Sequence, residues 1–334
     1  MKESEIRPAE ILNEYLRLSA TDAVAFFPDP ARFVHRPCPG CGTDAPRPAF
    51  VKNGFELSRC GGCGTLYVVS IPEDAELDAF YRDSPSQRYW ASVFFPAVAE
   101  ARRLKIFRPR VERLRTLLAD LGVTPRRVMD VGAGTGIFLE EARTLGFGEE
   151  YVAVEPNADL AATCREKGFS TFEGFGFEAA ADPSRADSAD LAVSFEVIEH
   201  VASPMDFIGD LGRLVRPGGL VVVSGLCGNG FDIAVLSAAS KAVAPPHHLN
   251  FLSRCGVADL LSRCGLEEVA FVTPGVLDVD IVRNTLIEHP DIPVDAFIRH
   301  LALDAPETTR AAFQHLITDH GLSSHMWVVA RRPE

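Results

Sequence analysis

The chain has 334 residues, 47% of them apolar, and a formal net charge of −13. This length and apolar content suit one large domain with a small accessory module. No apolar run reaches the roughly 18 residues of a membrane span, and the charged N-terminus does not resemble a signal peptide, so we expect a cytoplasmic protein. The acidic excess lies after residue 127, which makes that half a poor electrostatic match for nucleic acid.

The N-terminal third is expected to begin with a helical arm, residues 1–35, followed by a metal-binding ribbon, residues 36–72. Two Cys-x-x-Cys pairs lie in this ribbon: Cys38 with Cys41, and Cys60 with Cys63. Four thiolates at this spacing are typical of a closed structural zinc site. Asn53-Gly54 separates two strand-like runs between the pairs and predicts a hairpin. The alternative is four reduced cysteines without a metal.

Residues 73–126 are expected to form a helical connector or lid. An apolar stripe at helical spacing runs from Leu104 to Leu121, with Pro109 at a kink or a new start and Gly122 at the end. The connector also carries a basic cluster, defined as Arg102, Arg103, Lys105, Arg108, Arg110, Arg113 and Arg115. Two interpretations stay open for this cluster: a solvated helix face, or a site for the anionic group of a phosphorylated substrate. An aromatic group is read as packing or as part of a lid: Tyr81, Tyr89, Trp90, Phe94 and Phe95.

From residue 127 onward, strand-like and helix-like runs alternate. Strands are predicted at 126–131, 151–156, around Thr171, and at 189–197, 220–225, 266–274 and 325–332. Helices are predicted at 137–145, 158–168, 203–219 and 253–265, and about three more form an insert at about 276–322. This alternation predicts a doubly wound α/β sheet in a domain spanning 127–334, with ligands bound at the carboxyl ends of the strands. The insert is expected to wall the acceptor pocket or to form an interface.

The loop after the first of these strands, in "VMDVGAGTG", places Gly132, Gly134 and Gly136 at every second position. The dinucleotide fingerprint needs its third glycine where Ile137 stands. Asp130 ends the strand just before the loop, and a carboxylate there disfavours pyrophosphate but suits a cationic ligand. S-adenosylmethionine carries a sulfonium and an ammonium group. Glu155 ends the second strand, where an acidic residue binds a ribose diol.

At these residues the chain resembles the class I S-adenosylmethionine-dependent methyltransferases. "DVGAGTG" matches their first motif, Glu155 their second-strand acid, and "EVIEHV" with "LVRPGGLVVVS" their fourth- and fifth-strand regions. The resemblance implies a seven-stranded sheet with an antiparallel last strand. It places the glycine loop with Ala133 at the methionine part of the cofactor, Glu155 and Pro156 at the ribose, and Phe175 with the Phe195–Glu196 backbone at the adenine.

Two clusters are candidates for handling the acceptor. Glu196, Glu199 and His200 stand at helical spacing in "FEVIEHV", which resembles the ubiquinone-pathway O-methyltransferases, where E-x-x-E-H is linked to a divalent cation. The alternative is that Glu199 and His200 only brace the cofactor loop. His200 is also a candidate proton-transfer residue.

The second cluster is "APPHHLNFLS", with His247 and His248. It resembles the "HEHL" motif of deoxysugar C-methyltransferases, in which the second histidine is linked to catalysis. On that alignment His248 matches and His247 replaces a glutamate. Because adjacent residues of an extended chain point to opposite sides, we expect one of them to face the pocket as a general base. A structural histidine is the alternative.

We therefore expect methyl transfer to an oxygen or carbon of a small molecule, a sugar or secondary-metabolite intermediate that is phosphorylated or nucleotide-linked. Two other readings are an RNA methyltransferase with a zinc ribbon and a non-catalytic cofactor-binding regulatory protein. No membrane partner is expected, and the oligomeric state stays open.

Overall fold

The alternating runs after residue 126 form one seven-stranded sheet in the computed structural model, which describes residues 1–334. The strand order is β12-β13-β10-β9-β6-β7-β8. In chain order these strands are β6 (Arg127–Val131), β7 (Glu150–Glu155), β8 (Ser170–Glu173), β9 (Ala189–Phe195), β10 (Val215–Leu226), β12 (Glu267–Val272) and β13 (His325–Arg331). The last strand, β13, runs antiparallel to both of its neighbours, and the predicted doubly wound sheet is confirmed.

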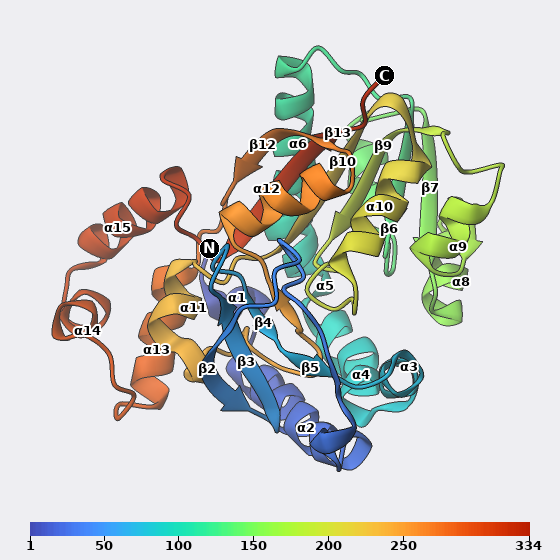
Figure 1. Ribbon diagram of the computed structural model, residues 1–334. Coiled ribbons are helices and arrows are strands. Elements are labelled where there is room, and N and C mark those ends of the chain that lie inside the picture. The colour runs from blue at the N-terminus through green and yellow to red at the C-terminus, as the bar shows by residue number, and fades with distance from the viewer.

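Helices cover both faces of this sheet (Figure 1). Helices α9 (Gly176–Ala181), α10 (Pro204–Leu214) and α12 (Arg254–Arg263) pack on one face, and α6 (Arg108–Asp120), α7 (Ile137–Thr144) and α8 (Ala158–Glu166) on the other. Strand β6 shows why two layers are needed, because Met129 and Val131 point into one core and Val128 into the other. Both faces are therefore apolar.

Successive strands are added first on one side of β6 and then on the other. After β6 the sheet grows outward through β7 and β8, and then returns to add β9 on the opposite side of β6. Such a switch point opens a crevice at the carboxyl ends of the central strands. The glycine loop, Glu155 and Glu196 each follow or end a strand at this edge.

One predicted boundary was wrong. The helix expected over 203–219 begins as predicted, with Ser203 Oγ accepting a hydrogen bond from the Asp206 N–H at 3.2 Å, but it ends at Leu214. Strand β10 starts at once and runs through "VRPGG". Pro217 lacks an amide donor and Gly218 has φ +74°, so these residues break the helix and form a bulge against β9 instead.

The N-terminal third builds a second, four-stranded sheet in the order β11-β4-β3-β2. Its strands are β2 (Pro46–Lys52), β3 (Phe55–Cys60), β4 (Leu66–Val68) and β11 (Asn250–Phe251), with a separate pair of β1 (Val34–His35) and β5 (Ser70–Ile71) beside them. Asn53 and Gly54 both have positive φ, which confirms the predicted hairpin between β2 and β3. Strand β11 comes from far along the chain and pairs antiparallel with β4. The sheet therefore includes a strand from outside the predicted ribbon, residues 36–72.

The remaining helices surround these two sheets (Figure 1). The arm contains α1 (Glu3–Ile6), α2 (Ala9–Phe26) and the short 3-10 turn Pro30–Arg32. The connector contains α3 (Asp74–Asp83), α4 (Pro85–Tyr89), π-helical segment η2 (Trp90–Phe94), α5 (Phe95–Arg102), π-helical segment η3 (Arg103–Phe107) and α6. Pro109 lies in the first turn of α6, and Gly122, with φ +68°, follows its end.

The aromatic group of the connector serves mainly for packing. Trp90 and Phe94 stack with ring centroids 4.2 Å apart and pack against Leu12 and Tyr15 of α2. After β10 come α11 (Phe231–Leu236), a 3-10 turn (Ser237–Ala239) and β11. Three helices precede β13, namely α13 (Asp278–Glu288), α14 (Ala296–Leu303) and α15 (Glu307–Asp319). None of the helices combines the length and apolar character that crossing a membrane requires.

Candidate functional site

The glycine loop forms an open cradle at the carboxyl end of β6. All three glycines have positive φ, +80° at Gly132, +56° at Gly134 and +74° at Gly136. A Cβ on Gly132 would lie 2.7 Å from Val197 Cγ2, and one on Gly136 would lie 3.1 Å from Cys164 Sγ, so both positions are closed by the protein itself. A Cβ on Gly134 would meet nothing within 4 Å. Gly134 is therefore the position at which a ligand can approach the backbone.

Glu155 closes this cradle from the next strand. Its Oε2 accepts a hydrogen bond from the Gly134 N–H at 2.8 Å, and its Oε1 accepts one from the Asn157 N–H at 3.0 Å. Burial raises the pKa of Glu155, while these two backbone donors favour its charged form. The predicted loop and the predicted acid are thus brought together. Pro156 follows at the surface, and Ala133 lies half-buried in the loop.

Asp130 lies beneath the loop and is 3% exposed, with no hydrogen bond or ion pair to its carboxylate. Burial raises its pKa to about 7, and the charge of Arg110 opposes that shift. A cation bound in the cradle would favour the ionised carboxylate, whereas a pyrophosphate would add a repulsive charge. The carboxylates of Asp130 and Glu155 therefore favour a cationic ligand over a pyrophosphate.

The aromatic residues expected near the adenine have different surroundings. Phe175, just before α9, is 48% exposed and stacks on Phe177 with ring centroids 5.7 Å apart. The Phe195 ring turns into the core beside Phe138 and Trp327, so its side chain is not available to an adenine.

Glu196 follows β9 and adopts φ +58°, a conformation that non-glycine residues rarely occupy. Its Oε1 accepts hydrogen bonds from Arg110 Nη2 at 2.9 Å and Ser224 Oγ at 2.6 Å, and lies 2.7 Å from His325 Nε2. Although burial raises it, the pKa of Glu196 is held well below its usual range by the charges of His325 and Arg110. The sequence predicted none of these three contacts, and Arg110 was named only as a member of the basic cluster.

Glu199, His200 and His248 converge in the crevice, with ligand atoms within 4.8 Å of one another. Glu199 Oε2 and His200 Nδ1 are buried and have no hydrogen-bond partner. His248 Nδ1 lies 2.6 Å from the Ala242 carbonyl oxygen, which leaves Nε2 free. One of the two readings of the sequence placed a cation at Glu196, Glu199 and His200, and the other had Glu199 and His200 brace the cofactor loop. In the structure Glu196 is engaged by Arg110, Ser224 and His325 instead, and His248 occupies the third position.

The two neighbouring histidines have different environments. His247 is fully buried, with Nε2 3.1 Å from Ser86 Oγ and Nδ1 3.4 Å from Gln87 Nε2, so it is held by α4 and faces no cavity. Burial lowers the pKa of His248 to about 4 and that of His200 to about 3. Both imidazoles are therefore neutral near pH 7 and available as ligands or proton acceptors. Tyr81 OH donates to the carbonyl oxygens of His200 and His247, which ties the two segments together.

This geometry agrees with a comparison to known families. The family model described as "Methyltransferase domain" matches residues 100–270, just over half of the chain. The chain belongs to the methyltransferase domain family.

Several curated proteins are similar to part of this chain. A ubiquinone biosynthesis O-methyltransferase of Roseobacter denitrificans is 30% identical over 152 residues, covering 43% of this chain and 60% of that protein. A tRNA U34 carboxymethyltransferase of Hahella chejuensis is 31% identical over 166 residues, covering 48% of this chain and 50% of that protein. The chain thus spans about half the length of the relatives that it matches.

The solved structures that align with the chain have lower identity. An S-adenosylmethionine-dependent methyltransferase from Archaeoglobus fulgidus aligns with a TM-score of 0.46 at 15% identity, covering 71% of this chain and 99% of that one. Geranyl diphosphate methyltransferase in complex with S-adenosylmethionine aligns with a TM-score of 0.45 at 16% identity, covering 71% of this chain and 90% of that one.

The four cysteines of the ribbon lie together against the methyltransferase domain. Cys38 and Cys63 Sγ are 3.6 Å apart, Cys41 and Cys60 Sγ are 3.5 Å apart, and all four sulfurs lie within 4.8 Å of one another. The Gly62 N–H donates to Cys60 Sγ at 3.3 Å, as is common around metal-bound thiolates. The set can hold a tetrahedral ion.

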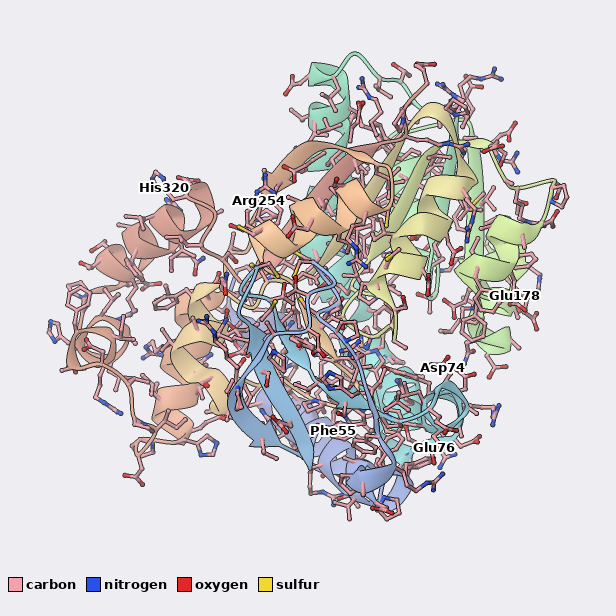
Figure 2. The ribbon with its side chains drawn as sticks, viewed as in Figure 1. Phe55, Asp74, Glu76, Glu178, Arg254 and His320 are labelled. Atoms are coloured by element: carbon pink, nitrogen blue, oxygen red, sulfur yellow. The ribbon has the colours of Figure 1, made fainter.

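This cysteine cluster docks on the start of α12. Ser253 Oγ donates to the Cys63 carbonyl oxygen at 2.6 Å, and Thr65 Oγ1 accepts from the Ser253 N–H at 3.1 Å. Figure 2 shows Arg254 at the start of α12 and Phe55 at the far end of the small sheet from that helix. The cysteine end of the ribbon therefore contacts the methyltransferase domain.

Proposed function

We propose that this methyltransferase domain transfers the methyl group of S-adenosylmethionine to an oxygen atom of a small molecule. The observation that carries the proposal is the cradle in which Gly134 faces open space, Glu155 is bound to the Gly134 amide, and Asp130 lies beneath without a partner. The name of the Roseobacter relative supports an oxygen acceptor. A sugar or secondary-metabolite intermediate remains the proposed acceptor class.

The protein's task in this chemistry is limited. The sulfonium already provides a good leaving group, so the site must align the acceptor oxygen with the methyl group and help to remove a proton. Glu155 would bind the ribose hydroxyls once the Gly134 amide turns to the ligand, and Asp130 would complement the positive charge of the cofactor.

Calorimetric titration with S-adenosylmethionine tests the cradle. We expect Glu155→Gln and Gly134→Val each to weaken binding at least about tenfold, because one removes a charged acceptor and the other fills the open space. Glu173→Gln is the matched control, because Glu173 ends β8 and only pairs with Arg165 at the surface. Unchanged affinity in both cradle variants, or binding of NADH in place of S-adenosylmethionine, would overturn the proposal.

We also propose that Glu199, His200 and His248 bind a divalent cation. Two neutral imidazoles with one carboxylate suit a transition-metal ion better than magnesium. When bound, such an ion lowers the pKa of an acceptor hydroxyl group. The three side chains would orient that hydroxyl group. Glu199 Oε2 and His200 Nδ1, which are buried without a hydrogen-bond partner, would gain the ion as their partner.

Mn²⁺ and Ni²⁺ titrated into the purified protein test this second site. His200→Ala and His248→Ala are expected to abolish binding, whereas His320→Ala, at the exposed end of α15 in Figure 2, is expected to leave it unchanged. If neither ion binds the unmodified protein, the cation proposal fails and His248 becomes the candidate general base.

We propose that Cys38, Cys41, Cys60 and Cys63 hold one structural zinc ion. All four positions are filled by protein, which leaves no place for a substrate. Elemental analysis is expected to find about one zinc per chain and to find it missing in Cys41→Ser. A carefully purified protein with far less zinc would refute the assignment.

An RNA acceptor is a second candidate, because the Hahella relative is named a tRNA U34 carboxymethyltransferase. The net charge of −13 opposes it. Filter binding of bulk tRNA separates the two: we expect negligible retention at 50 mM salt, and tight, steeply salt-dependent binding would favour RNA. Transfer of labelled methyl groups to any acceptor would exclude a purely regulatory role.

A further inference from the structure

The loop between β9 and α10, residues 196–203, carries Glu199 and His200 and contains no helix or strand. We call it the Glu199–His200 loop. The backbone carbonyl oxygens of five successive residues, 198–202, each accept a hydrogen bond from a residue outside the loop. An irregular segment has no hydrogen-bond ladder of its own, so its backbone polar groups are satisfied from elsewhere. The conformation of this loop is therefore set by the residues that surround it.

Asn250 of β11 provides the largest share of these bonds. Its side-chain Nδ2 donates to the carbonyl oxygens of Ile198 at 3.0 Å and Val201 at 2.8 Å, which lie on either side of the two candidate ligands. Its backbone N–H at 3.2 Å and that of Leu249 at 2.7 Å donate to the Glu199 carbonyl oxygen. Asn250 is 1% exposed and its Oδ1 has no partner, so all the hydrogen bonds of its side chain go to this loop.

Tyr81 of α3 holds the fourth carbonyl group. Its hydroxyl group, whose one hydrogen is shared between two acceptors, lies 3.2 Å from the His200 carbonyl oxygen and 3.0 Å from that of His247. His247 directly precedes His248. This contact therefore links the backbones of the two segments that carry histidine ligands.

Strand β4 of the ribbon fixes the position of Asn250. Asn250 lies opposite Tyr67 in the antiparallel pair of β11 and β4. The Val68 N–H donates to the Leu249 carbonyl oxygen at 3.0 Å, just before that pair. Both residues that donate to the Glu199 carbonyl oxygen are thus held by the ribbon.

Arg36 completes the set of five from the same module. It precedes the first cysteine of the cluster, Cys38, by two residues. Its Nη1 donates to the Ala202 carbonyl oxygen at 2.8 Å, and its Nη2 donates to that of Leu249 at 3.0 Å. The ribbon therefore holds both the Glu199–His200 loop and the segment that carries His248.

The cofactor cradle is built without the ribbon. The Gly132 and Ala133 N–H groups donate to the Val154 carbonyl oxygen at 2.9 and 3.3 Å, and the Gly134 N–H donates to Glu155. All of these residues belong to β6, β7 or the loop between β6 and α7. The hydrogen bonds from the ribbon thus reach the cation side of the crevice and not the cofactor side.

We propose that Asn250 is a positioning residue. Together with Arg36 and Tyr81 it holds the Glu199–His200 loop opposite His248, so that the three candidate ligands meet at one ion. The ribbon is thereby a structural part of the acceptor side of the site. This inference rests on the proposed methyl-transfer function with its cation, and it names what fixes the geometry. Metal–ligand distances must be met to within about 0.2 Å, so a small displacement of the loop lowers affinity.

Calorimetric titration with Mn²⁺ or Ni²⁺, and separately with S-adenosylhomocysteine, tests the positioning role. Asn250→Ala removes two hydrogen bonds to the loop. We expect it to weaken ion binding at least about tenfold while the affinity for S-adenosylhomocysteine changes by less than about twofold. Asn229→Ala is the matched control and should leave both affinities unchanged. Asn229 also bonds the ribbon, accepting from Arg59 Nη1 at 2.9 Å, but it bonds no residue of the loop.

Amide hydrogen exchange, measured without added ion, gives a second readout. The amides of residues 249 and 250 both donate to the Glu199 carbonyl oxygen, so they should exchange slowly in the unmodified protein. In Asn250→Ala we expect both to exchange at least about tenfold faster, because the loop that accepts their bonds is released. The amides of Gly132 and Ala133 in the cradle should exchange at unchanged rates.

Unchanged exchange at residue 249 in Asn250→Ala, or unchanged ion affinity where the unmodified protein binds the ion, would overturn the inference. If the unmodified protein binds neither ion, the cation proposal fails and the exchange rates alone decide the positioning role. If it does not bind S-adenosylhomocysteine, the proposed function fails and the same exchange rates decide. Should Asn250→Ala not fold, Tyr81→Phe removes a single hydroxyl group and takes its place, with the same criteria applied to the His200 amide, which donates to Val197.

Discussion

Two buried aspartates, Asp278 and Asp232, have different surroundings. The carboxylate of Asp278 accepts hydrogen bonds from Ser323 Oγ at 2.9 Å, the Ser324 N–H at 2.8 Å and Gln314 Nε2 at 2.9 Å. Neither oxygen of Asp232 has a partner, although the residue is 1% exposed. Burial and the neighbouring charge of Asp278 raise the pKa of Asp232 to about 7, against a weaker opposing effect of Arg7.

Asp232 is therefore expected to make stability depend on pH. Its ordinary pKa is 3.8, so between about pH 4 and pH 7 the folded protein holds a proton that the unfolded chain has released. Stability must fall as the pH rises through this window and level off above it. Asp232→Asn removes the loss, so its melting temperature should exceed that of the unmodified protein at pH 8 and match it at pH 4.5.

Thermal denaturation at the two pH values checks this prediction. The control is Asp259→Asn, at an exposed position of α12, which should shift neither melting temperature. An Asp232→Asn variant that is less stable than the unmodified protein at pH 8 would contradict the prediction.

Among single residues, the sequence identifies those whose role is set by their position in a local backbone motif. Gly132, Gly134 and Glu155 could be identified because short, fixed spacings place them on one loop and the next strand end. His325 could not, because it lies 129 residues from its partner Glu196, at the start of a strand that carries no motif. Arg110 was recognised only as one of seven basic residues, since the sequence does not show which of them pair.

Among the elements, the ribbon and the segments that carry Glu199, His200 and His248 are joined by one half-buried arginine. Arg36 donates from Nε to the Val68 carbonyl oxygen at 2.9 Å, from Nη1 to that of Ala202 at 2.8 Å and from Nη2 to that of Leu249 at 3.0 Å. Burial lowers its pKa to about 10, so it stays charged near pH 7. Val68 belongs to β4, Ala202 follows the Glu199–His200 segment, and Leu249 follows His248.

Replacing Arg36 should loosen all three segments. We expect Arg36→Ala to lower the free energy of unfolding by about 3 kcal/mol or more, because charged hydrogen bonds contribute about 1.5–3 kcal/mol each and three carbonyl groups lose their donor. Urea denaturation measures the change. Arg32→Ala, which removes only an exposed ion pair with Glu76, should cost less than about 1 kcal/mol. Similar losses for both variants would show that Arg36 does not join the segments.

The sequence predicts elements well where periodicity and end signals agree. Helix α12 has its cap at Ser253, and β9 is a mostly apolar run, so both were expected at nearly their observed positions. The boundary at Leu214 was missed, because the bulge in β10 depends on pairing with β9. The short segment "LNF" after the two histidines looks strand-like and forms β11, but its pairing with β4 could not be read from the sequence.

In the whole molecule, the small sheet and the methyltransferase domain share a hydrophobic core. Phe55, Leu57 and Leu66 of the ribbon pack in one cluster with Leu226 at the end of β10 and with Ile233 and Phe251 beyond it. A modular arrangement could be read from the sequence, since the cysteine pairs and the glycine loop are far apart in it. The shared core could not, because it depends on contacts between residues almost 200 positions apart.

This shared core predicts a single cooperative unfolding transition. Differential scanning calorimetry should give one peak, with the van't Hoff enthalpy close to the calorimetric enthalpy. A metal chelator should shift the whole peak to lower temperature, since loss of zinc would weaken the core common to both parts. Two separated peaks, or a chelator effect confined to one of them, would contradict the prediction.

The pairing of β4 with β11 also limits how chains of this fold can be recombined. A chimaera with a crossover between residues 72 and 127 would combine β4 from one parent with β11 from another, two residues after the histidine loop. Register errors of a single position would then turn His248 away from Glu199. Functional hybrids should therefore be recovered when both paired strands come from the same parent.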